Sequence, residues 1–505
     1  MASDLPERPT TSDLRLALES HLAEGAARVD HPALIQIADL WSQLLRPDQM
    51  EALNAENLLS NMVHIIETGD LHESQQITLA STLRELESRR RPKLSADLSA
   101  RLNEVCRPIL TRLADTLNMA PRRLPLSKVR RAHVIFAGAD NGNVNERSAP
   151  AIDYAAALAL DTRVERIEIV HSGSISRERA ADIRAILRTA GRRPEINFVS
   201  TLENDDFMVD LLGRGPCTFH FCGEPSLSPV ISLASRLGPT VMFVGSDETP
   251  VQYADVYWNW RSTEMIADHW ARQGAPSVFA RNHLQVLQVP GRTPPVRDRL
   301  SREALGLAED AVVIATVGGR LEVEMDEAYI TGIELAIRDR PNCYWLVAGE
   351  LPDFLSDACR QVLGARFLYI PHPGDLGGLM TIADIFANPF REAGGSDARL
   401  AAAAGAAILT LDRGEVAAVA PADFLGLDTE DYFRRLAALI EAPELLAALK
   451  SHQAEHLDQI GDPEILIANL NKIVRVASDR YEGRGRGAPL SETVFAPPPR
   501  LAVAS

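Results

Sequence analysis

A glycine-rich turn in the C-terminal part of the chain carries the strongest chemical signal. Residues 388–405 read NPFREAGGSDARLAAAAG, so Gly394, Gly395, Ser396 and Asp397 lie at the predicted start of a small-residue helix. The first amides of a helix have no partner inside the helix, and with the helix dipole they attract anions. Glycine lets a backbone approach an anion closely. A plain tight turn with a Ser or Asp helix cap is the alternative interpretation.

Two other residues suit a bound diphosphate. Arg320 follows Gly318 and Gly319 at the end of a predicted strand. Its guanidinium can hold a phosphate through two parallel hydrogen bonds. His372, in the loop PHPGD, is a second candidate contact for a nucleotide or a sugar. With the glycine-rich turn, these residues favour an anionic ligand such as a phosphate.

The first half of the chain offers polar side chains that suit an acceptor. The loop ADNGNVNER follows a predicted strand and can either meet acceptor hydroxyl groups or form a capped turn. Its candidate residues are Asp140, Asn141, Asn143 and Glu146. His220, in CTFHFCGEPS, can act as a base or serve only as a structural histidine.

These residues need parallel sheets to bring them together. Short apolar strands alternate with helices over residues 133–292 and again from residue 311. This alternation is typical of doubly wound parallel sheets, in which ligands bind at the carboxyl ends of the strands. We therefore expect an α/β fold with two Rossmann-like domains facing a cleft, preceded by an all-α domain.

The predicted organisation has four parts. Residues 13–118 show apolar positions three and four apart, which indicates helices. The parts are a helical module at 1–126, an acceptor domain at 127–295, a donor domain at 296–478 and a flexible tail at 479–505. The basic segment 119–131 is interpreted as a solvated connector.

Composition excludes several classes of protein. The chain of 505 residues carries a net charge of −17, whereas a nucleic-acid binder needs a basic face. The five cysteines form no CxxC pair, which indicates buried thiols in a reducing compartment. No apolar run reaches the roughly 20 residues of a membrane span, and no signal peptide is evident. The expectation is a soluble cytoplasmic protein.

Common catalytic motifs are missing from the sequence. Neither first strand–helix turn has GxGxxG, which argues against a dinucleotide dehydrogenase. P-loop, HExxH and GxSxG motifs are also missing. We expect no catalytic metal and no cofactor.

The second half resembles the donor-binding domain of GT-B glycosyltransferases, which have two Rossmann domains around a cleft. One strand ends in Gly-Gly-Arg, another ends in AGE, and ADIFANPF precedes an acid, a Gly-rich turn and a helix ending at Gly405. This order is similar to glycosyltransferase family 4. The NPF strand end and the helical N-terminal region are similar to the O-GlcNAc-transferase and bacterial protein N-glucosyltransferase group. The resemblance covers about residues 133–478.

The resemblance implies roles for individual residues. When Gly405 is aligned with the closing glycine of the family 4 pattern, Glu392 matches the first acid, which contacts the transferred sugar. The lysine and the second acid of that pattern fall on Met325 and Leu400. His220 matches a strand-end histidine that lies over the cleft and serves the acceptor.

The resulting expectation is a metal-independent glycosyltransferase of the hexosyltransferase type. It would move a sugar from a nucleotide-diphosphate sugar to a protein, glycan or lipid-linked glycan. The expected catalytic residues are His220, Asp140 and Glu392; the donor residues are Gly319, Arg320, His372 and Gly394–Asp397; the acceptor residues are Asn141, Asn143 and Glu146. The alternatives are a sugar-nucleotide epimerase and an inactive scaffold whose helical module binds a partner or a second copy.

Overall fold

The computed structural model divides the chain into two compact units. It describes residues 52–69, 71–73, 75–77, 79–80, 83, 95–116, 126–129, 131–137, 148–171, 181, 184, 195–200, 217–222, 229–245, 249–259, 263–285, 301–319, 321–371, 376–391, 394–460 and 463–484. Unit 1 comprises Met1–Val244, Glu248–Gln285 and Asn469–Ser505; unit 2 comprises Gly245–Asp247 and Val286–Ala468. Each unit contains one parallel sheet, so the expected α/β class with two Rossmann-like sheets is confirmed.

The sheet of unit 1 has seven strands in the order β3-β2-β1-β4-β5-β6-β7. They are β1 (Ala132–Phe136), β2 (Arg166–His171), β3 (Glu195–Ser200), β4 (Thr218–Phe221), β5 (Thr240–Phe243), β6 (Val256–Asn259) and β7 (His283–Gln285). All pairs are parallel, and the direction of winding reverses between β1 and β4. The sequence did not predict β6 and β7, because VYWN and HLQ mix apolar and polar residues and form no continuous apolar run.

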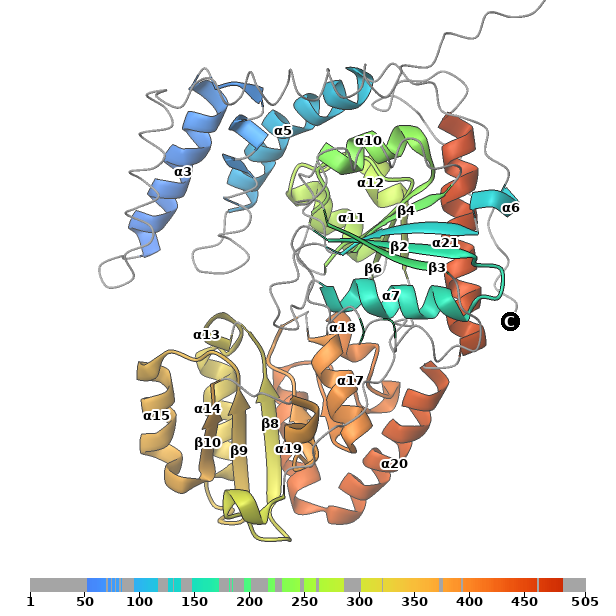
Figure 1. Cartoon of the computed structure of the whole chain (residues 1–505). Helices are drawn as coiled ribbons and strands as arrows, with labels where there is room; N and C mark the ends of the chain where they lie inside the picture. The colour runs from blue at the N-terminus through green and yellow to red at the C-terminus, as the bar shows by residue number, and fades with distance from the viewer. Residues whose placement is uncertain are drawn as a thin grey trace, which may run out of the picture. The chain divides into compact units, whose positions relative to one another are not determined.

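Helices cover both faces of this sheet (Figure 1). In unit 1 they are α3 (Ala52–Thr68), α5 (Ala96–Thr116), α6 (Leu126–Val129), α7 (Ser148–Leu160), α10 (Pro229–Leu237), α11 (Thr263–Arg272), α12 (Ser277–Arg281) and most of α21 (Pro463–Arg484). Phe136, Phe221 and Tyr257 point to the face that carries α10, α11 and α12. Because side chains alternate along a strand, His133 and His220 point to the opposite face, where Tyr154 of α7 packs on them.

The described helices of residues 1–126, the expected helical module, belong to unit 1. Helices α3 and α5 bury a shared apolar cluster that includes Leu59, Val63 and Leu102. On its other side, α5 reaches the turn after α11, where Asn103 Nδ2 donates to Gln273 O over 3.1 Å. Gly274 in that turn has φ +70°, and a Cβ there would lie 2.9 Å from Ala100 Cβ. This glycine therefore lets α5 pack directly on the α/β body of unit 1.

The chain returns to unit 1 at its C-terminal end. Arg480 of α21 donates to Asp255 O and Asn282 O, each over 2.9 Å, and Tyr481 is fully buried. Burial lowers the pKa of Arg480, whose guanidinium is satisfied by backbone carbonyls. The expected donor-domain end at residue 478 therefore differs from the unit boundary at Ala468, and residues 479–484 of the expected tail form the end of α21.

The sheet of unit 2 has five parallel strands in the order β10-β9-β8-β11-β12. They are β8 (Val312–Val317), β9 (Cys343–Ala348), β10 (Phe367–Ile370), β11 (Ile385–Ala387) and β12 (Ala407–Leu409). The helices are α13 (Leu321–Glu324), α14 (Glu327–Ile337), α15 (Asp353–Leu363), α16 (Leu376–Met380), α17 (Gly395–Ala404), α18 (Gly414–Ala417), α19 (Thr429–Glu441) and α20 (Pro443–Ile460). The described residues of unit 2 also include three 3₁₀ turns: η2 (Glu303–Leu305) before β8, η3 (Gly364–Arg366) between α15 and β10, and η4 (Ala422–Phe424) between α18 and α19.

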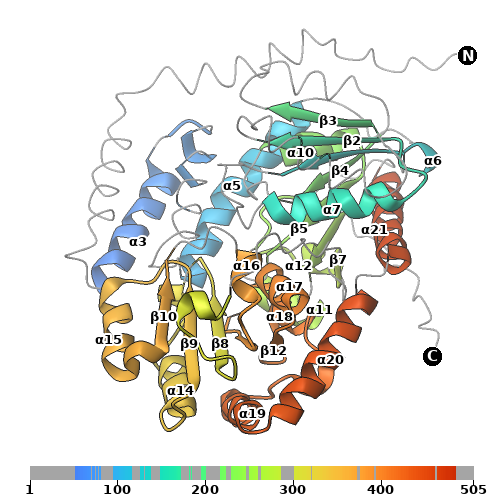
Figure 2. The same ribbon diagram turned by 60° about the horizontal axis from the view of Figure 1, so that its bottom comes forward.

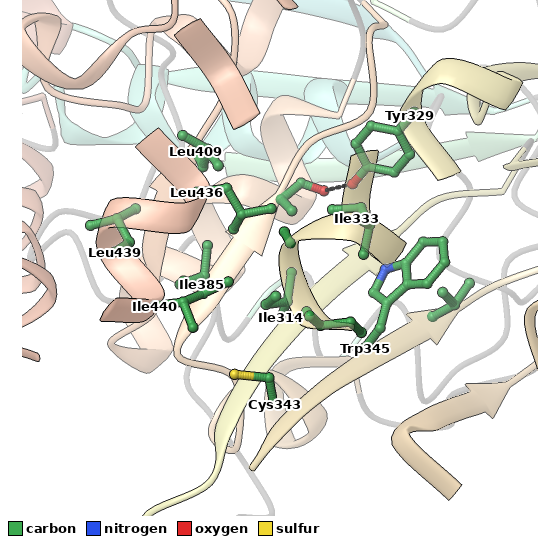
Figure 3. Close-up of a cluster of buried hydrophobic side chains, with 14 of the residues drawn as sticks. Ile314, Tyr329, Ile333, Cys343, Trp345, Ile385, Leu409, Leu436, Leu439 and Ile440 are labelled. Carbon is green, nitrogen blue, oxygen red and sulfur yellow. Dashed lines mark hydrogen bonds between the residues drawn. The ribbon is translucent and has the colours of Figure 1, made fainter. Parts of the chain in front are cut away.

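Two apolar cores sandwich the sheet of unit 2. Ile314, Trp345 and Ile385 point to the face that carries α14, α15 and α19, and Figure 3 shows these side chains packed with Tyr329, Ile333 and Leu436. Val313, Ala315 and Phe386 point to the other face, where α16, α17 and α18 pack. The alanines of α17 belong to this second core, so small side chains let the helix lie close to the strands.

Two expectations from the composition, which concern the cysteines and membrane-spanning helices, can be compared with the described residues. All five cysteines are buried and carry free thiols. In the described ranges, every helix is too short or too polar to cross a membrane.

Candidate functional site

The candidate site lies at the switch point of the sheet in unit 2. The winding direction reverses between β8 and β11, which pair with each other. In open α/β sheets this is where ligands bind, beyond the carboxyl ends of the strands. Gly318 and Gly319 follow β8 there, and the NPF segment follows β11 and leads to the start of α17.

A glycine opens helix α17 at this point. Gly394 is the N-cap residue and has φ +104°, a left-handed conformation that strongly favours glycine. Because it is a glycine, the N-cap residue has no side chain that could cap the helix. Gly405 closes the helix in the same way, with φ +96°. The expected helix start at Gly394–Ser396 is therefore present, and its first amides lie at the switch point.

A carboxylate already contacts one of these amides. Gly395 N donates to Glu415 Oε2 over 3.2 Å. Glu415 belongs to α18, which lies beside α17 (Figure 2). A Cβ at position 395 would lie 2.9 Å from Glu415 Cβ, so glycine is needed for this close packing. The position thus holds a negative group at the helix N-terminus, as the helix dipole favours.

Arg391 is the central side chain of the switch point. Its Nε donates to Asn388 Oδ1 over 2.9 Å, and its Nη2 donates to Val317 O over 2.6 Å. Its Nη1 forms an ion pair with Glu324 of α13, and the two side chains are only 6% and 9% exposed. Asp397 Oδ2 lies 3.8 Å from Arg391 Nη2. One buried guanidinium therefore connects β8, α13, the NPF segment and the first turn of α17.

Buried hydroxyl groups fix the strand ends behind this network. Tyr329 Oη lies 2.8 Å from Thr316 Oγ1 and donates to Ala387 O over 2.8 Å. Tyr432 Oη donates to Asn388 O over 3.0 Å. Burial raises the pKa of both tyrosines, so both are neutral hydrogen-bond donors near neutral pH.

Different side chains occupy the switch point of unit 1, which lies between β1 and β4. His133 Nδ1 and His220 Nε2 lie 2.9 Å apart, and the ring of Tyr154 lies 4.9 Å from that of His220. His220 is 0% exposed. Burial, and then the neighbouring His133, lowers the pKa of His220 well below its ordinary range. The structure thus places His220 as a neutral ring inside the sheet–helix core, whereas the sequence placed it over a cleft.

The other predicted site residues divide into two groups. Ser396 and Asp397 are partly buried in the first turn of α17, and Gly319 is exposed after β8. Asp397 joins the network around Arg391 through its 3.8 Å contact. The remaining predicted residues, which are Asp140, Asn141, Asn143, Glu146, Arg320, His372 and Glu392, lie outside the described residues.

Sequence reasoning missed Arg391 and Glu415. Arg391 stands between the NPF strand end and the two glycines, and an arginine next to such a turn is the signal that could have identified it. Its ion-pair partner Glu324 lies 67 residues away, where no local pattern reveals it. Glu415 carries no comparable signal in the sequence.

Metal ligands do not gather in the part of the chain that the structure describes. No three His, Cys, Asp or Glu side chains among those residues could hold one metal ion. The charged groups at the switch point of unit 2 pair with Arg391 or with a helix amide instead.

Comparison with solved structures finds a protein of similar fold. The chain is similar to a mutant of the Thermobaculum terrenum O-GlcNAc transferase, with a TM-score of 0.55 and 14% identity over 95% of this chain and 100% of that one. This likeness is one of fold. No protein-family model matches the chain, and no curated protein matches it.

Two further solved structures are similar to a lower degree. A glycosyltransferase from Rickettsia africae ESF-5 has a TM-score of 0.46 and 8% identity over 71% of this chain and 99% of that one. A mutant of S. aureus TarM, in complex with fondaparinux, alpha-GlcNAc-glycerol and UDP, has a TM-score of 0.39 and 8% identity over 51% of this chain and 55% of that one.

Proposed function

We propose that the chain is a glycosyltransferase that moves a sugar from a nucleotide-diphosphate sugar to an acceptor without a metal ion. Breaking the glycosidic bond to the donor leaves negative charge on the departing diphosphate. A site that stabilises this charge with fixed backbone donors lowers the barrier. The protein would thus need free amides and a cation at one place.

The observation that carries the proposal is the start of α17 at the switch point of unit 2. Gly394 turns the chain so that the helix amides begin there, and small residues seat the helix on the sheet. The likeness in fold to an O-GlcNAc transferase supports the proposal of a glycosyltransferase. In this proposal, the amides from Gly395 to Asp397 face the diphosphate and Arg320 supplies the cation. Gly319 and His372 would line the same donor site.

The sugar and acceptor sides of the reaction rest on the sequence. Glu392 would orient the hydroxyl groups of the transferred sugar. Asp140 is the proposed acceptor-side base, with Asn141, Asn143 and Glu146 as acceptor contacts. His220 would act from the core as support for that side, since its ring is fully buried. The acceptor would be a protein, a glycan or a lipid-linked glycan.

A panel of nucleotide sugars tests the proposal. The purified full chain is incubated with UDP-, GDP- and dTDP-linked sugars, and nucleoside diphosphate release is followed alongside direct binding. Slow donor hydrolysis with one base and one sugar is the expected result. Conversion of the donor to its epimer without diphosphate release would favour an epimerase, and neither binding nor turnover with any donor would remove the enzyme proposal.

Two variants test the assigned roles. Arg320→Ala should weaken binding of the nucleoside diphosphate, and an unchanged affinity would remove Arg320 from the phosphate role. Glu392→Gln should lower turnover more than it lowers nucleotide affinity, because it touches the sugar in this proposal. Arg360→Ala is a matched control, since Arg360 is exposed on α15 and pairs only across one helical turn with Asp357.

One observation favours a catalytically inactive scaffold as the second candidate. Met325, at the lysine position of the family 4 pattern, is 3% exposed and packs in the core under α14. This position therefore supplies no cation to a diphosphate. The scaffold candidate predicts that the chain binds nucleoside diphosphates weakly or not at all, and the donor panel separates the two.

A further inference from the structure

We propose that Arg391 is the positioning residue of the donor site: its buried guanidinium sets the spacing between the Gly318–Gly319 turn and the start of α17. The inference rests on the proposed function, because it concerns the site where the diphosphate would bind. It differs from a ligand role, in which Arg391 itself would touch the phosphate.

The first argument is the steric fit between the guanidinium and two glycines. A Cβ added at Gly318 would overlap Arg391 Nη1, and a Cβ at Gly394 would lie 2.5 Å from Nη2. Gly318 follows β8 and Gly394 precedes α17. The guanidinium thus packs against the backbone of both turns, and its size determines how closely they approach each other.

The second argument is the set of hydrogen bonds. Arg391 Nη2 donates to Val317 O over 2.6 Å, directly before Gly318, and Nε donates to Asn388 Oδ1 over 2.9 Å. Only a guanidinium has donors in a planar fork that reach a backbone carbonyl, an amide oxygen and a carboxylate together. A lysine at this position would keep the charge but lose the geometry.

The third argument is charge balance. Glu324 pairs with Nη1 in a buried contact, and Asp397 approaches Nη2 at 3.8 Å. In these contacts the charge of Arg391 faces two carboxylates, which favours a structural role for the guanidinium over direct contact with a phosphate. In this proposal, the phosphate is held by the amides that Arg391 positions and by a cation from elsewhere.

The Glu324→Gln variant distinguishes a positioning role of Arg391 from a role as phosphate ligand, because the two roles predict opposite changes in nucleotide affinity. If Arg391 positions the turns, loss of its buried partner loosens them, and affinity for the best-binding nucleoside diphosphate of the panel should fall about tenfold or more. If Arg391 is a phosphate ligand, release from Glu324 should raise that affinity instead, which would overturn the proposal. Glu441→Gln, which removes the partner of Arg340 on the exposed surface, is the matched control and should leave affinity unchanged.

Two readouts do not depend on nucleotide binding. Arg391→Lys should speed hydrogen exchange at the amides of residues 395–398, with little change at β9. The stability loss caused by Gly318→Ala should also be smaller in an Arg391→Gln background, because the overlapping guanidinium is gone. Unchanged exchange in Arg391→Lys, or additive losses in the double variant, would overturn the inference. Failure of the wild-type chain to bind any nucleoside diphosphate would count against the proposed function alone.

Discussion

In both sheets the winding direction reverses between the first and the fourth strand in chain order, but different side chains pack at the two switch points. In unit 1, the rings of His133, Tyr154 and His220 pack between sheet and helix. In unit 2, the guanidinium of Arg391 packs against Gly318 and Gly394. The first group consists of aromatic rings, whereas the second is a charged guanidinium that packs directly against the backbone of two glycines.

The difference shows what each group can do. Tilted, closely packed rings bury area and stabilise a scaffold, but they keep the backbone segments apart by the width of a side chain. A guanidinium between glycines lets two turns approach each other closely. The proposed donor site lies at the unit 2 switch point, whereas the buried rings at the unit 1 switch point stabilise the packing of α7 on its sheet.

The largest expected effect comes from removing the guanidinium of Arg391 at the unit 2 switch point. Arg391→Ala leaves Glu324 buried without its partner and opens a cavity, so we expect a loss of about 3–5 kcal/mol in the free energy of unfolding. Urea denaturation followed by the fluorescence of Trp345, in the core of unit 2, reports the change, with variants of the other tryptophans as background. A loss below about 1 kcal/mol would mean that the ion pair is not a structural element of the switch point.

The second expected effect concerns pH and unit 1. The pKa of His220 is lowered by burial and by His133, and burial lowers the pKa of His283 to about 4. The folded state therefore binds fewer protons than the unfolded state below the ordinary histidine pKa of 6.5, so stability falls as pH falls below that value. Among the described residues, His133 and Tyr154 face His220, and Cys222 acts on Tyr154; burial raises the pKa of both Tyr154 and Cys222.

His220→Gln tests this pH dependence. The variant should be about 1–2 kcal/mol less stable than the wild type at pH 7.5, because a ring is lost from a packed core. It cannot take up a proton at position 220, so the difference from the wild type should shrink between pH 7 and pH 5. A difference that stays constant over this range would show that His220 does not titrate on unfolding.

The smallest expected effect comes from the carboxylate of Glu415 on α18, which contacts the start of α17. Glu415 accepts a hydrogen bond from Gly395 N and would compete there with a phosphate. Glu415→Gln removes this negative charge from the helix N-terminus, so affinity for a nucleoside diphosphate should rise about two- to fivefold. Isothermal titration measures the change, and Glu430→Gln, in the first turn of α19, is the matched control. A fall in affinity would mean that Glu415 supports the site instead.

The sequence predicted the fold class because its apolar strands are long enough to read. AVVIATVGG contains β8, and HVIFAGA contains all but the first residue of β1. The order of strands and helices then indicated parallel sheets. It could not place α21, since a helix that packs on the first sheet after the chain has left it has no local signature. Its anchor, Arg480, bonds to carbonyls more than 190 residues earlier in the chain.

The candidate site was predictable only where it depends on local backbone. Glycines before a run of alanines indicated the start of α17 correctly, because the turn and the helix are both local. The Arg391–Glu324 pair joins residues 67 apart, and burial, not sequence spacing, decides that they meet. The proposed roles of Arg320, Glu392 and His372 stay predictions from the sequence.

The path of the chain has a consequence for synthesis. Unit 2 is complete once Ala468 has left the ribosome, whereas unit 1 still lacks Arg480 and Tyr481 at that moment. The unit that begins first in the sequence therefore finishes last, and the carbonyls of Asp255 and Asn282, next to β6 and β7, gain the guanidinium of Arg480 only when α21 arrives. We therefore expect unit 1 to expose apolar surface for longer than unit 2 during translation.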